Sequence, residues 1–285
     1  MRKKFFATLA TSLVLIVGLY FYVQVSEAES KVFKVTFLNV GQGDSALIRF
    51  SDGEKMLVDC GVNSKILEKL GEHLPFYDRV IDYLLITHPD SDHYGGCVDV
   101  LKRYDVKQVI TNSDTKKGDS FWAVWEKYLE EENAVHKIIS KPQVWEIDGA
   151  KIEFLSPDKS LGLESKYEKG NNNSIVFRLV HGSESFLFMG DAELPVEMAL
   201  INKYCASSTV EASCPQIDAD YLKVGHHGSD SSSDEKFLEA VSPATAIISV
   251  GKNSFGHPSF RILKKLERAE AEILRTDHDG DIIME

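Results

Sequence analysis

Leu85-Ile86-Thr87-His88-Pro89-Asp90-Ser91-Asp92-His93-Tyr94-Gly95-Gly96 is the stretch on which the fold of this chain depends. The apolar run 83–86 predicts a buried strand. The strand is followed by four metal-competent side chains: His88, Asp90, Asp92 and His93. Imidazole and carboxylate are ligands of zinc and, with more oxygen, of manganese. We therefore predict a loop that wraps two ions and then turns sharply at its two glycines. The alternative is a solvated polar loop.

This stretch resembles the H-x-H-x-D-H signature of the metallo-β-lactamase superfamily. It has the H-x-D-x-D-H-x-G-G form of the extracellular hydrolase domain of ComEC, a DNA-uptake protein, and of its stand-alone relatives. Asp90 stands where the superfamily has a second histidine, which makes the first metal site richer in oxygen. The resemblance covers essentially all of residues 32–285. It implies an α/β fold, the αββα four-layer sandwich, whose ligand loops converge at one edge.

Two later motifs occur in the family's order. Gly190-Asp191 ends an apolar strand, and the resemblance makes Asp191 the carboxylate that bridges two ions, since one aspartate offers two oxygens. The alternative is an aspartate that caps the helix predicted at 194–204. His226-His227-Gly228-Ser229 matches the family's H-H-G-S. We favour His227 as the ligand and His226 as the neighbouring polar contact.

A third motif, residues 253–258, resembles the family's N-x-[FY]-G-H-P. Its His257 precedes a predicted helix whose N-terminus can hold an anion. We interpret His257 as a contact to a substrate phosphate or an oxyanion, and a capping or packing role is the alternative. The resemblance thus implies the metal ligands His88, Asp90, Asp92, His93, Asp191 and His227, with catalytic roles for Asp92, His226 and His257.

Five further residues are expected to support this site. Asp59 follows a predicted strand and would order the metal loop through hydrogen bonds. Gln42 and Asp44 would approach the site from the G-Q-G-D loop. Asn173 and Ser174 lie in a pattern that stands where many superfamily members have a histidine ligand. We expect one of them to face the first metal or to bind substrate, without ligating directly.

The N-terminus, residues 1–28, carries an export signal. Arg2-Lys3-Lys4 precedes the uncharged stretch 5–26, whose core is strongly apolar, and small residues follow at a candidate cleavage site. This pattern predicts a signal peptide or, if it is not cleaved, a signal anchor associated with the membrane. A buried core helix is the alternative. Export would place the hydrolase domain, 29–285, outside the cell: secreted, or anchored on the outer face of the cytoplasmic membrane.

Four cysteines suit that compartment. Cys205 and Cys214 flank a segment rich in Ser and Thr, and a disulfide between them is plausible. ComEC-like proteins usually carry Thr or Ser at the position of Cys60 and an aliphatic residue at that of Cys97. This joint departure suggests a second disulfide, Cys60–Cys97. Two unlinked small core residues are the alternative.

Composition and net charge limit the kinds of substrate that the protein can bind. The chain of 285 residues is 43% hydrophobic and 27% charged, which is ordinary for a globular enzyme. Its formal net charge is −12, and the first 28 residues contain more basic than acidic side chains, so the remainder is still more acidic. Tight nonspecific binding of DNA needs a basic surface. The charge therefore favours a small or envelope substrate over long DNA.

The pattern of apolar residues predicts two strand-rich halves, roughly 32–147 and 148–285. Phe33, Val35 and Phe37 share one face of the first strand. The helix predicted at 120–133 has an apolar stripe that we assign to packing: Phe121, Val124, Trp125, Tyr128 and Leu129. The runs 273–276 and 281–284 are interpreted as a closing hairpin.

These features predict an exported enzyme with two divalent metal ions, zinc or manganese. The resemblance points to a phosphodiesterase that acts on nucleic acid, DNA included, or on a phosphate-bearing envelope polymer. A metal-dependent lactone or ester hydrolase is the alternative, because the same ions would serve it. A non-catalytic binding module is the third class, and the nearly complete ligand set argues against it.

Overall fold

The computed structural model describes residues 13, 17–18, 32–163, 169–205 and 214–285. The predicted signal, 1–28, lies outside the described residues apart from positions 13, 17 and 18. Within the described ranges, no helix is both long enough and apolar enough to cross a membrane.

The first sheet has seven strands in the order β14-β1-β2-β3-β4-β5-β6. Neighbours from β14 to β3 are antiparallel, and those from β3 to β6 are parallel. Its strands are β1 (Lys34–Phe37), β2 (Ala46–Arg49), β3 (Lys55–Val58), β4 (Val80–Leu85), β5 (Asp105–Thr111), β6 (Val135–Ile138) and β14 (Ile282–Met284).

The second sheet also has seven strands, in the order β13-β12-β11-β10-β9-β8-β7. Strands β7 to β10 form an antiparallel meander, and β10 to β13 are parallel. Its strands are β7 (Gln143–Ile147), β8 (Ala150–Ser156), β9 (Val176–His181), β10 (Glu184–Phe188), β11 (Tyr221–Lys223), β12 (Thr245–Ile248) and β13 (Glu272–Arg275).

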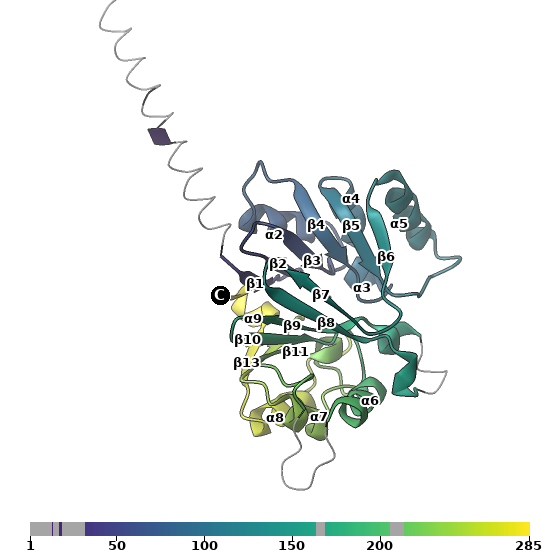
Figure 1. The fold of residues 1–285 in the computed structure, drawn as a ribbon, viewed down its shortest axis with the longest axis vertical. Helices are drawn as coiled ribbons and strands as arrows, with labels where there is room; N and C mark the ends of the chain where they lie inside the picture. The colour runs from purple at the N-terminus through teal and green to yellow at the C-terminus, as the bar shows by residue number, and fades with distance from the viewer. Residues whose placement is uncertain (1–12, 14–16, 19–31, 164–168, 206–213) are drawn as a thin grey trace, which may run out of the picture.

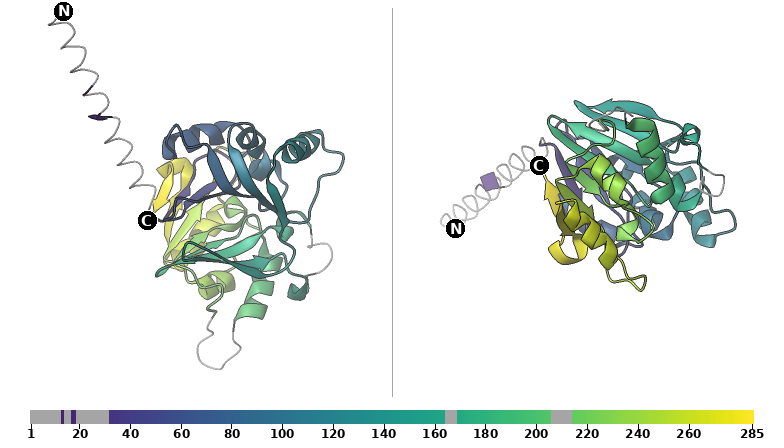
Figure 2. Two further views of the ribbon diagram at one scale, coloured as in Figure 1. Left: turned by 45° about the horizontal axis from the view of Figure 1, so that its top comes forward. Right: turned by 90° about the horizontal axis from the view of Figure 1, so that it is seen from below.

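Helices cover the outer face of each sheet, so the molecule has four layers (Figure 1). The other views in Figure 2 show the same arrangement. The first sheet carries α2 (Lys65–His73), α4 (Cys97–Leu101) and α5 (Ser120–Glu131), and the second carries α6 (Leu194–Tyr204), α7 (Glu235–Val241) and α8 (Phe260–Arg268). This arrangement confirms the predicted αββα sandwich.

The apolar side chains form three cores, one between each pair of layers. Successive residues of a strand point to opposite faces of the sheet, so neighbouring apolar residues belong to different cores. Ile48 of β2 lies between the two sheets, whereas Leu47 packs under the helices of the first sheet. Phe33, Val35 and Phe37 all lie in the core between the sheets, as predicted. A third core joins the second sheet to its helices.

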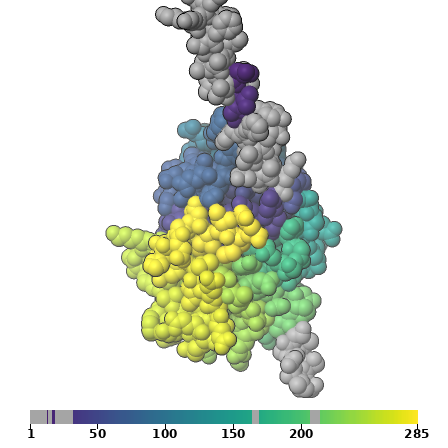
Figure 3. Space-filling view, turned by 90° about the vertical axis from the view of Figure 1, so that its left-hand side faces the viewer, coloured from purple at the N-terminus to yellow at the C-terminus, as the bar shows by residue number. Residues whose placement is uncertain are grey.

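The predicted closing hairpin is wrong. Strand β13 pairs with β12 in the second sheet, whereas β14 pairs with β1 in the first. The short helix α9 (Thr276–Asp279) separates them, and the Asp281 carboxylate then accepts a hydrogen bond from the Asn39 backbone at 2.7 Å. The division at residue 147 is also inexact, since β7 belongs to the second sheet. Figure 3 shows the C-terminal residues, in yellow, beside the purple N-terminal strand.

The packing stripe predicted for α5 is partly wrong. Trp122 and Trp125 are the buried residues of this helix, while Phe121 and Val124 are exposed. The Trp122 ring packs edge-on against Tyr94 of the metal loop, with 5.0 Å between ring centroids. Trp125 is buried, and Tyr128 and Leu129 pack against the same core, as predicted. Only the first turn of the helix differs from the prediction, because Trp122 is buried there in place of Phe121 and Val124.

Both suggested disulfides are present. Cys60 and Cys97 are buried and join the loop after β3 to the start of α4, with Cα atoms 5.2 Å apart. Cys205 and Cys214 join the end of α6 to the segment before β11, with Cα atoms 4.2 Å apart. The first bridge thus ties together the two loops that flank the metal-competent residues.

The two disulfides should contribute unequally to stability. Their sequence separations are 37 and 9 residues. Because loop-closure entropy grows with separation, replacing Cys60 and Cys97 by alanine should lower the free energy of unfolding by about 4 kcal/mol, against about 2.5 kcal/mol for Cys205 and Cys214. Urea unfolding of the two double variants measures the difference. An equal or larger loss at the 205–214 bridge would contradict this expectation.

Candidate metal centre

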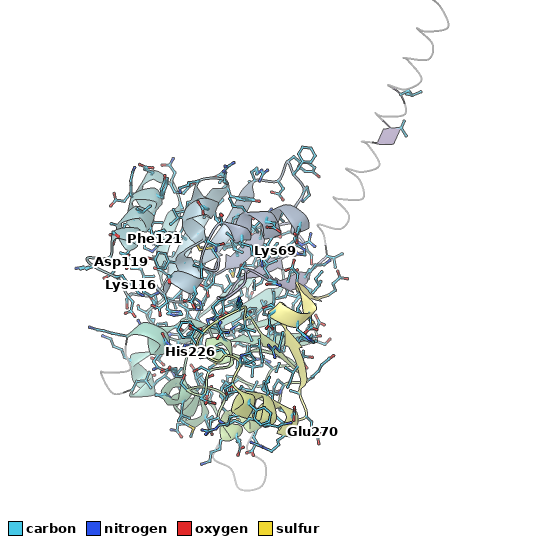
Figure 4. All side chains as sticks on the ribbon, turned by 180° about the vertical axis from the view of Figure 1, so that it is seen from behind. Lys69, Lys116, Asp119, Phe121, His226 and Glu270 are labelled. Atoms are coloured by element: carbon cyan, nitrogen blue, oxygen red, sulfur yellow. A yellow bond between two sulfur atoms is a disulfide. The ribbon has the colours of Figure 1, made fainter. Side chains whose placement is uncertain are left out.

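The metal-competent residues meet at one edge of the sandwich, where the carboxyl ends of strands from both sheets come together. Asp59 follows β3, and the loop beginning at His88 follows β4. Asp191 follows β10, and His226 lies in the short turn η4 (Gly225–Gly228) after β11. Figure 4 shows His226 at the junction of the two halves. Each half therefore supplies part of one site.

Asp191 lies at the middle of this site. Its Oδ1 is 3.2 Å from Nε2 of His93 and 3.6 Å from Nε2 of His227. Its Oδ2 is 3.9 Å from Nε2 of His88 and 3.8 Å from Nε2 of His226. The carboxylate is nearly inaccessible to solvent. Four imidazoles thus face one buried carboxylate, two at each of its oxygens.

The buried Asp59 organises the loop after β4. One carboxylate oxygen accepts a hydrogen bond from the Thr87 backbone at 2.8 Å. The other lies 2.7 Å from the Thr87 hydroxyl and 2.8 Å from Nδ1 of His93. Because Nδ1 of His93 is engaged by the carboxylate, its Nε2 is directed at Asp191. This is the placement expected of a residue that orders the metal loop.

Asp44 supports His227 from the opposite sheet. Its Oδ1 lies 3.1 Å from Nδ1 of His227, which is also 2.9 Å from the Ser249 carbonyl. Its other oxygen pairs with the buried Lys223 ammonium at 2.7 Å. Lys223 is not among the residues predicted for the site, although a lysine within an apolar strand just before H-H-G-S was a usable signal. The structure places a buried Lys–Asp–His chain behind the site.

Asp90 and Asp92 lie at the more open side of the site. Asp92 Oδ2 is 3.3 Å from Nε2 of His227, and Asp90 Oδ2 is 3.6 Å from Nε2 of His88. The other oxygen of Asp90 pairs with the Lys116 ammonium, another residue that the sequence analysis did not identify. Figure 4 shows Lys116 and Asp119 on the upper half, above His226.

His226 and His257 lie beside each other, with 5.5 Å between ring centroids. Nδ1 of His226 is 3.3 Å from Oε1 of Glu193 and 3.1 Å from the Ser231 hydroxyl. Nδ1 of His257 is buried and has no hydrogen-bond partner among the described residues. The first turn of α8 is capped by the Ser259 hydroxyl, which accepts from the Ile262 backbone. Glu193 and Ser231 had no signal in the sequence motifs.

Three supporting residues each make a hydrogen bond in which one of the two partners is a backbone group. Gln42 accepts a hydrogen bond from Gly251 at 3.4 Å, and the backbone carbonyl of Asn173 accepts one from Asn112 at 2.8 Å. The Ser174 hydroxyl accepts from the Asp191 backbone at 3.2 Å, so Ser174 positions the central carboxylate. These contacts place all three residues around the site without showing ligation.

Gly43 allows the G-Q-G-D loop to approach the metal loop closely. A Cβ atom at this position would lie 2.2 Å from the Asp92 carbonyl oxygen, and its φ of +122° is unfavourable for other residues. The neighbouring Asp44 backbone donates to the same carbonyl at 3.2 Å. The close approach brings Asp44 and Asp92 to His227 from two sides.

The charges of these residues shift one another's pKa. Burial raises the pKa of Asp191, but His93 and His227 lower it more, and it lies well below its usual range. Burial lowers the pKa of His227, but Asp191 and Asp44 raise it more, to about 10. The pKa of His93 is raised well above its usual value, because the charges of Asp191 and Asp59 outweigh burial. Positive charge is therefore strongly favoured around the Asp191 carboxylate.

The donor atoms fit divalent cations. Nε2 of His88, His93 and His227 and Oδ1 of Asp191 are buried without a hydrogen-bond partner among the described residues. Each such atom costs about 1–3 kcal/mol if nothing binds it. The donor atoms of His88, His93 and Asp191 lie within 4.8 Å of one another, as do those of Asp92, His93 and His227. Nitrogen and oxygen donors in this mixture suit zinc or manganese.

The chain belongs to the metallo-beta-lactamase superfamily, whose family model matches residues 38–252. The fold and the convergent donors support a metal-dependent hydrolase. Within the superfamily the chain is ComEC-like. It is 32% identical over 270 residues to ComE operon protein 3 of Bacillus subtilis (strain 168), covering 87% of this chain and 32% of that protein.

Other relatives agree with this assignment. Competence protein ComA of Neisseria gonorrhoeae is 30% identical over 248 residues, covering 86% of this chain and 31% of that protein. The chain thus spans about a third of the length of both curated relatives. The structure of CmlA, a diiron beta-hydroxylase from Streptomyces venezuelae, shares the fold with a TM-score of 0.57 and 13% identity, covering 88% of this chain and 54% of that one.

Metal uptake should release protons. In the metal-free protein His227 is protonated below its pKa of about 10, whereas a histidine must be neutral to ligate. Apparent metal affinity should therefore rise about tenfold per pH unit for each proton displaced, and flatten above pH 10. Without metal, the raised pKa stabilises the fold fully below the ordinary histidine value, and this contribution is lost as pH rises through 10.

Calorimetry of zinc and manganese binding at pH 7.5, in two buffers with different ionisation enthalpies, counts the released protons. Asp44→Asn removes one of the charges that raise the pKa of His227, so this variant should release fewer. Binding without proton release in the unchanged protein would contradict the expectation.

Proposed function

We propose that this protein is an exported, binuclear metal-dependent phosphodiesterase that acts on nucleic acid or on a phosphate-bearing envelope polymer. The observation that carries the proposal is the convergence of unpaired imidazole nitrogens on the buried Asp191 carboxylate. Two disulfides in a ComEC-like chain suit an oxidising compartment. With the predicted signal at 1–28, they support a location outside the cytoplasm.

The residues that would hold the two cations are those expected from the family motif: Asp191 would be common to both, and Asp92 would hold the second. When bound, such a pair supplies a deprotonated water near neutral pH and screens the charge of a phosphate. Asp59 and Asp44 hold His93 and His227 with Nε2 toward the centre. Their role is to keep the imidazoles in one orientation before substrate arrives.

The other residues act on water and on the substrate. Asp92 is partly exposed and reaches the centre. Its carboxylate can therefore orient the attacking water by accepting a hydrogen bond from the water's O–H. Glu193 and Ser231 hold Nδ1 of His226, which turns Nε2 to the centre. Burial, with the charges of His226 and His227, lowers the pKa of His257. A neutral His257 with an unpaired Nδ1 can steady the oxygen that leaves phosphorus.

The rim of the site favours nucleic acid among phosphodiesters. Phe255 is 72% exposed, and its ring lies 5.7 Å from that of His257. An exposed aromatic ring beside a cleavage site suits stacking of an unpaired base. The competence protein among the relatives points the same way. The net charge of −12 disfavours a long duplex, so a single strand or short fragment is the preferred form.

Turnover tests the proposal directly. The metal-loaded protein should hydrolyse bis-p-nitrophenyl phosphate and single-stranded DNA. Asp92→Asn should lower both rates by about 10²- to 10³-fold, since it removes a group aimed at the reacting atoms, and Asp191→Ala should abolish them. Asp105→Ala, an exposed aspartate paired with Lys107, is the matched control. Turnover of lactones alone would support the alternative hydrolase, and bound metal without turnover would support a binding module.

Phe255 should matter for nucleic acid alone. Phe255→Ala should raise the KM for single-stranded DNA by about 5- to 100-fold, the range expected for loss of one stacked base. The rate with bis-p-nitrophenyl phosphate should be unchanged. Phe76 is a matched control, because it is 70% exposed and precedes β4 at the edge opposite the site. A similar effect of Phe76→Ala, or none of Phe255→Ala, would argue against base stacking.

A further inference from the structure

A pocket of about 310 Å³ lies next to the metal centre and is not used by the mechanism above. Segments that follow β5, β6 and β8 line it, together with the short helix η3 (Gly170–Asn173). Its volume is at the lower end of the range for small-molecule sites. It is large enough for one sugar phosphate and too small for a folded partner.

One wall of the pocket holds an unsatisfied hydroxyl. Ser156, the last residue of β8, is only 1% exposed, and its Oγ has no hydrogen-bond partner among the described residues. A buried unpaired hydroxyl costs about 1–3 kcal/mol. Such a group at the wall of a polar pocket is explained if the pocket takes a ligand that hydrogen-bonds it.

The pocket lining carries more ammonium charge than uncompensated carboxylate charge. Asp158 is engaged by the Lys203 ammonium and by the backbone and hydroxyl of Ser160. Asp114 accepts a hydrogen bond from the Gly170 backbone at 2.9 Å. Lys159 and Lys169 are exposed and form no ion pair with any residue that the structure describes. In a chain of net charge −12, these two ammonium groups, which have no ion pair within the described ranges, outnumber the one uncompensated carboxylate of Asp114. Together with a donor hydroxyl they favour an anion.

Helix η3 connects this pocket to the metal centre. Asn172 lines the pocket, and its side chain exchanges hydrogen bonds with Glu193 at 3.0 and 3.1 Å. Glu193 in turn holds His226 at 3.3 Å. The amide of Asn171 lies 3.4 Å from the same imidazole. Asn172 and Glu193 therefore connect the pocket to His226, so a chain-like substrate bound at the centre can extend into the pocket.

We propose that this pocket is a subsite for a second phosphate of the substrate, next to the phosphodiester at the metal centre. Lys159 and Lys169 contact this phosphate, and Ser156 with Asn172 contacts the sugar or polyol that carries it. The proposal rests on the proposed function and deepens it: the substrate is a polymer with a phosphate on successive units. Nucleic acid and a polyol-phosphate envelope polymer share this chemistry.

Kinetics on paired substrates test the subsite. Thymidylyl-thymidine with and without a terminal phosphate should be distinguished by the unchanged protein. The double variant Lys159→Gln/Lys169→Gln should raise the KM for the phosphorylated form about tenfold, as expected for a lost charged hydrogen bond. It should leave bis-p-nitrophenyl phosphate unaffected. Lys102→Gln/Lys107→Gln, two surface lysines paired with Asp99 and Asp105, is the control. An equal effect on every substrate, or none, overturns the proposal.

Ser156→Ala removes only the hydroxyl and so separates its contribution from that of the ammonium groups. This variant should raise the KM for the phosphorylated dinucleotide. Its rate with bis-p-nitrophenyl phosphate should be unchanged. Replacing the dinucleotides by a glycerol phosphate dimer and its terminally phosphorylated form distinguishes the two polymers. The polymer type whose terminal phosphate lowers KM more is the better substrate. If the terminal phosphate lowers KM in neither the dinucleotide pair nor the glycerol phosphate pair, the proposal is overturned.

A binding measurement separates failure of the subsite from failure of the proposed function. Thymidine 3′,5′-bisphosphate is titrated into the metal-loaded protein, and NMR follows the backbone amides of residues 156–159 and 169–173. Shifts that disappear in the double lysine variant support the subsite, even if no phosphodiester is hydrolysed. Shifts confined to residues around Asp191, or none at all, overturn it, because the pocket then holds only water.

Discussion

The buried carboxylate of Asp191 is the constraint around which this molecule is organised. A carboxylate cannot be buried cheaply unless positive charge or hydrogen-bond donors surround it. Here four imidazoles from both halves of the chain face it within 3.2 to 3.9 Å, and its backbone is held by Ser174. The electrostatic requirement of one side chain thus explains why loops from two sheets meet at one edge.

The sandwich supplies the rigidity that this arrangement needs. The core between the sheets is built from large apolar side chains such as Phe37 and Phe177, which fix the separation of the two halves. The Cys60–Cys97 bridge and the hydrogen bond from Cys60 to the His93 carbonyl, at 2.7 Å, join the metal loop to its neighbour. Packing stabilises the fold, while the orphaned nitrogens at the centre oppose it until a cation binds.

The supporting residues divide the site into a fixed interior and an adaptable rim. Asp59, Asp44 and Lys223 are buried and hold His93 and His227 from behind. Phe255 is exposed, and Lys116 pairs with Asp90 at the open side of the site. Helix η3 connects the centre to the neighbouring pocket through Asn172 and Glu193. Such a division is what a hydrolase needs, because the reacting groups must be rigid while substrates differ beyond the scissile bond.

The sequence by itself determined the family, the αββα layers and a short set of chemistry-bearing residues. These follow from local properties: strand alternation, glycines at turns, and motifs such as the loop from His88 to His93. The same motifs carry the expectation of four metal ligands in the first half, from His88 to His93, and of two in the second, Asp191 and His227. Which of them ligate, and what the cations are, stays a prediction.

Only the tertiary structure decided how distant segments combine. Alternation identifies a strand but not its partner, so the last two strands were assigned to one hairpin although they lie in different sheets. The same limit assigned Phe121 and Val124 to the buried face of α5, where Trp122 is buried instead. Lys116, Lys223 and Glu193 carry no motif, and they became part of the site because folding brings them to Asp90, Asp44 and His226. Long-range electrostatics and packing set these contacts. A lysine in an apolar strand before H-H-G-S marks Lys223 as unusual, but no local pattern identifies Asp44 as its partner.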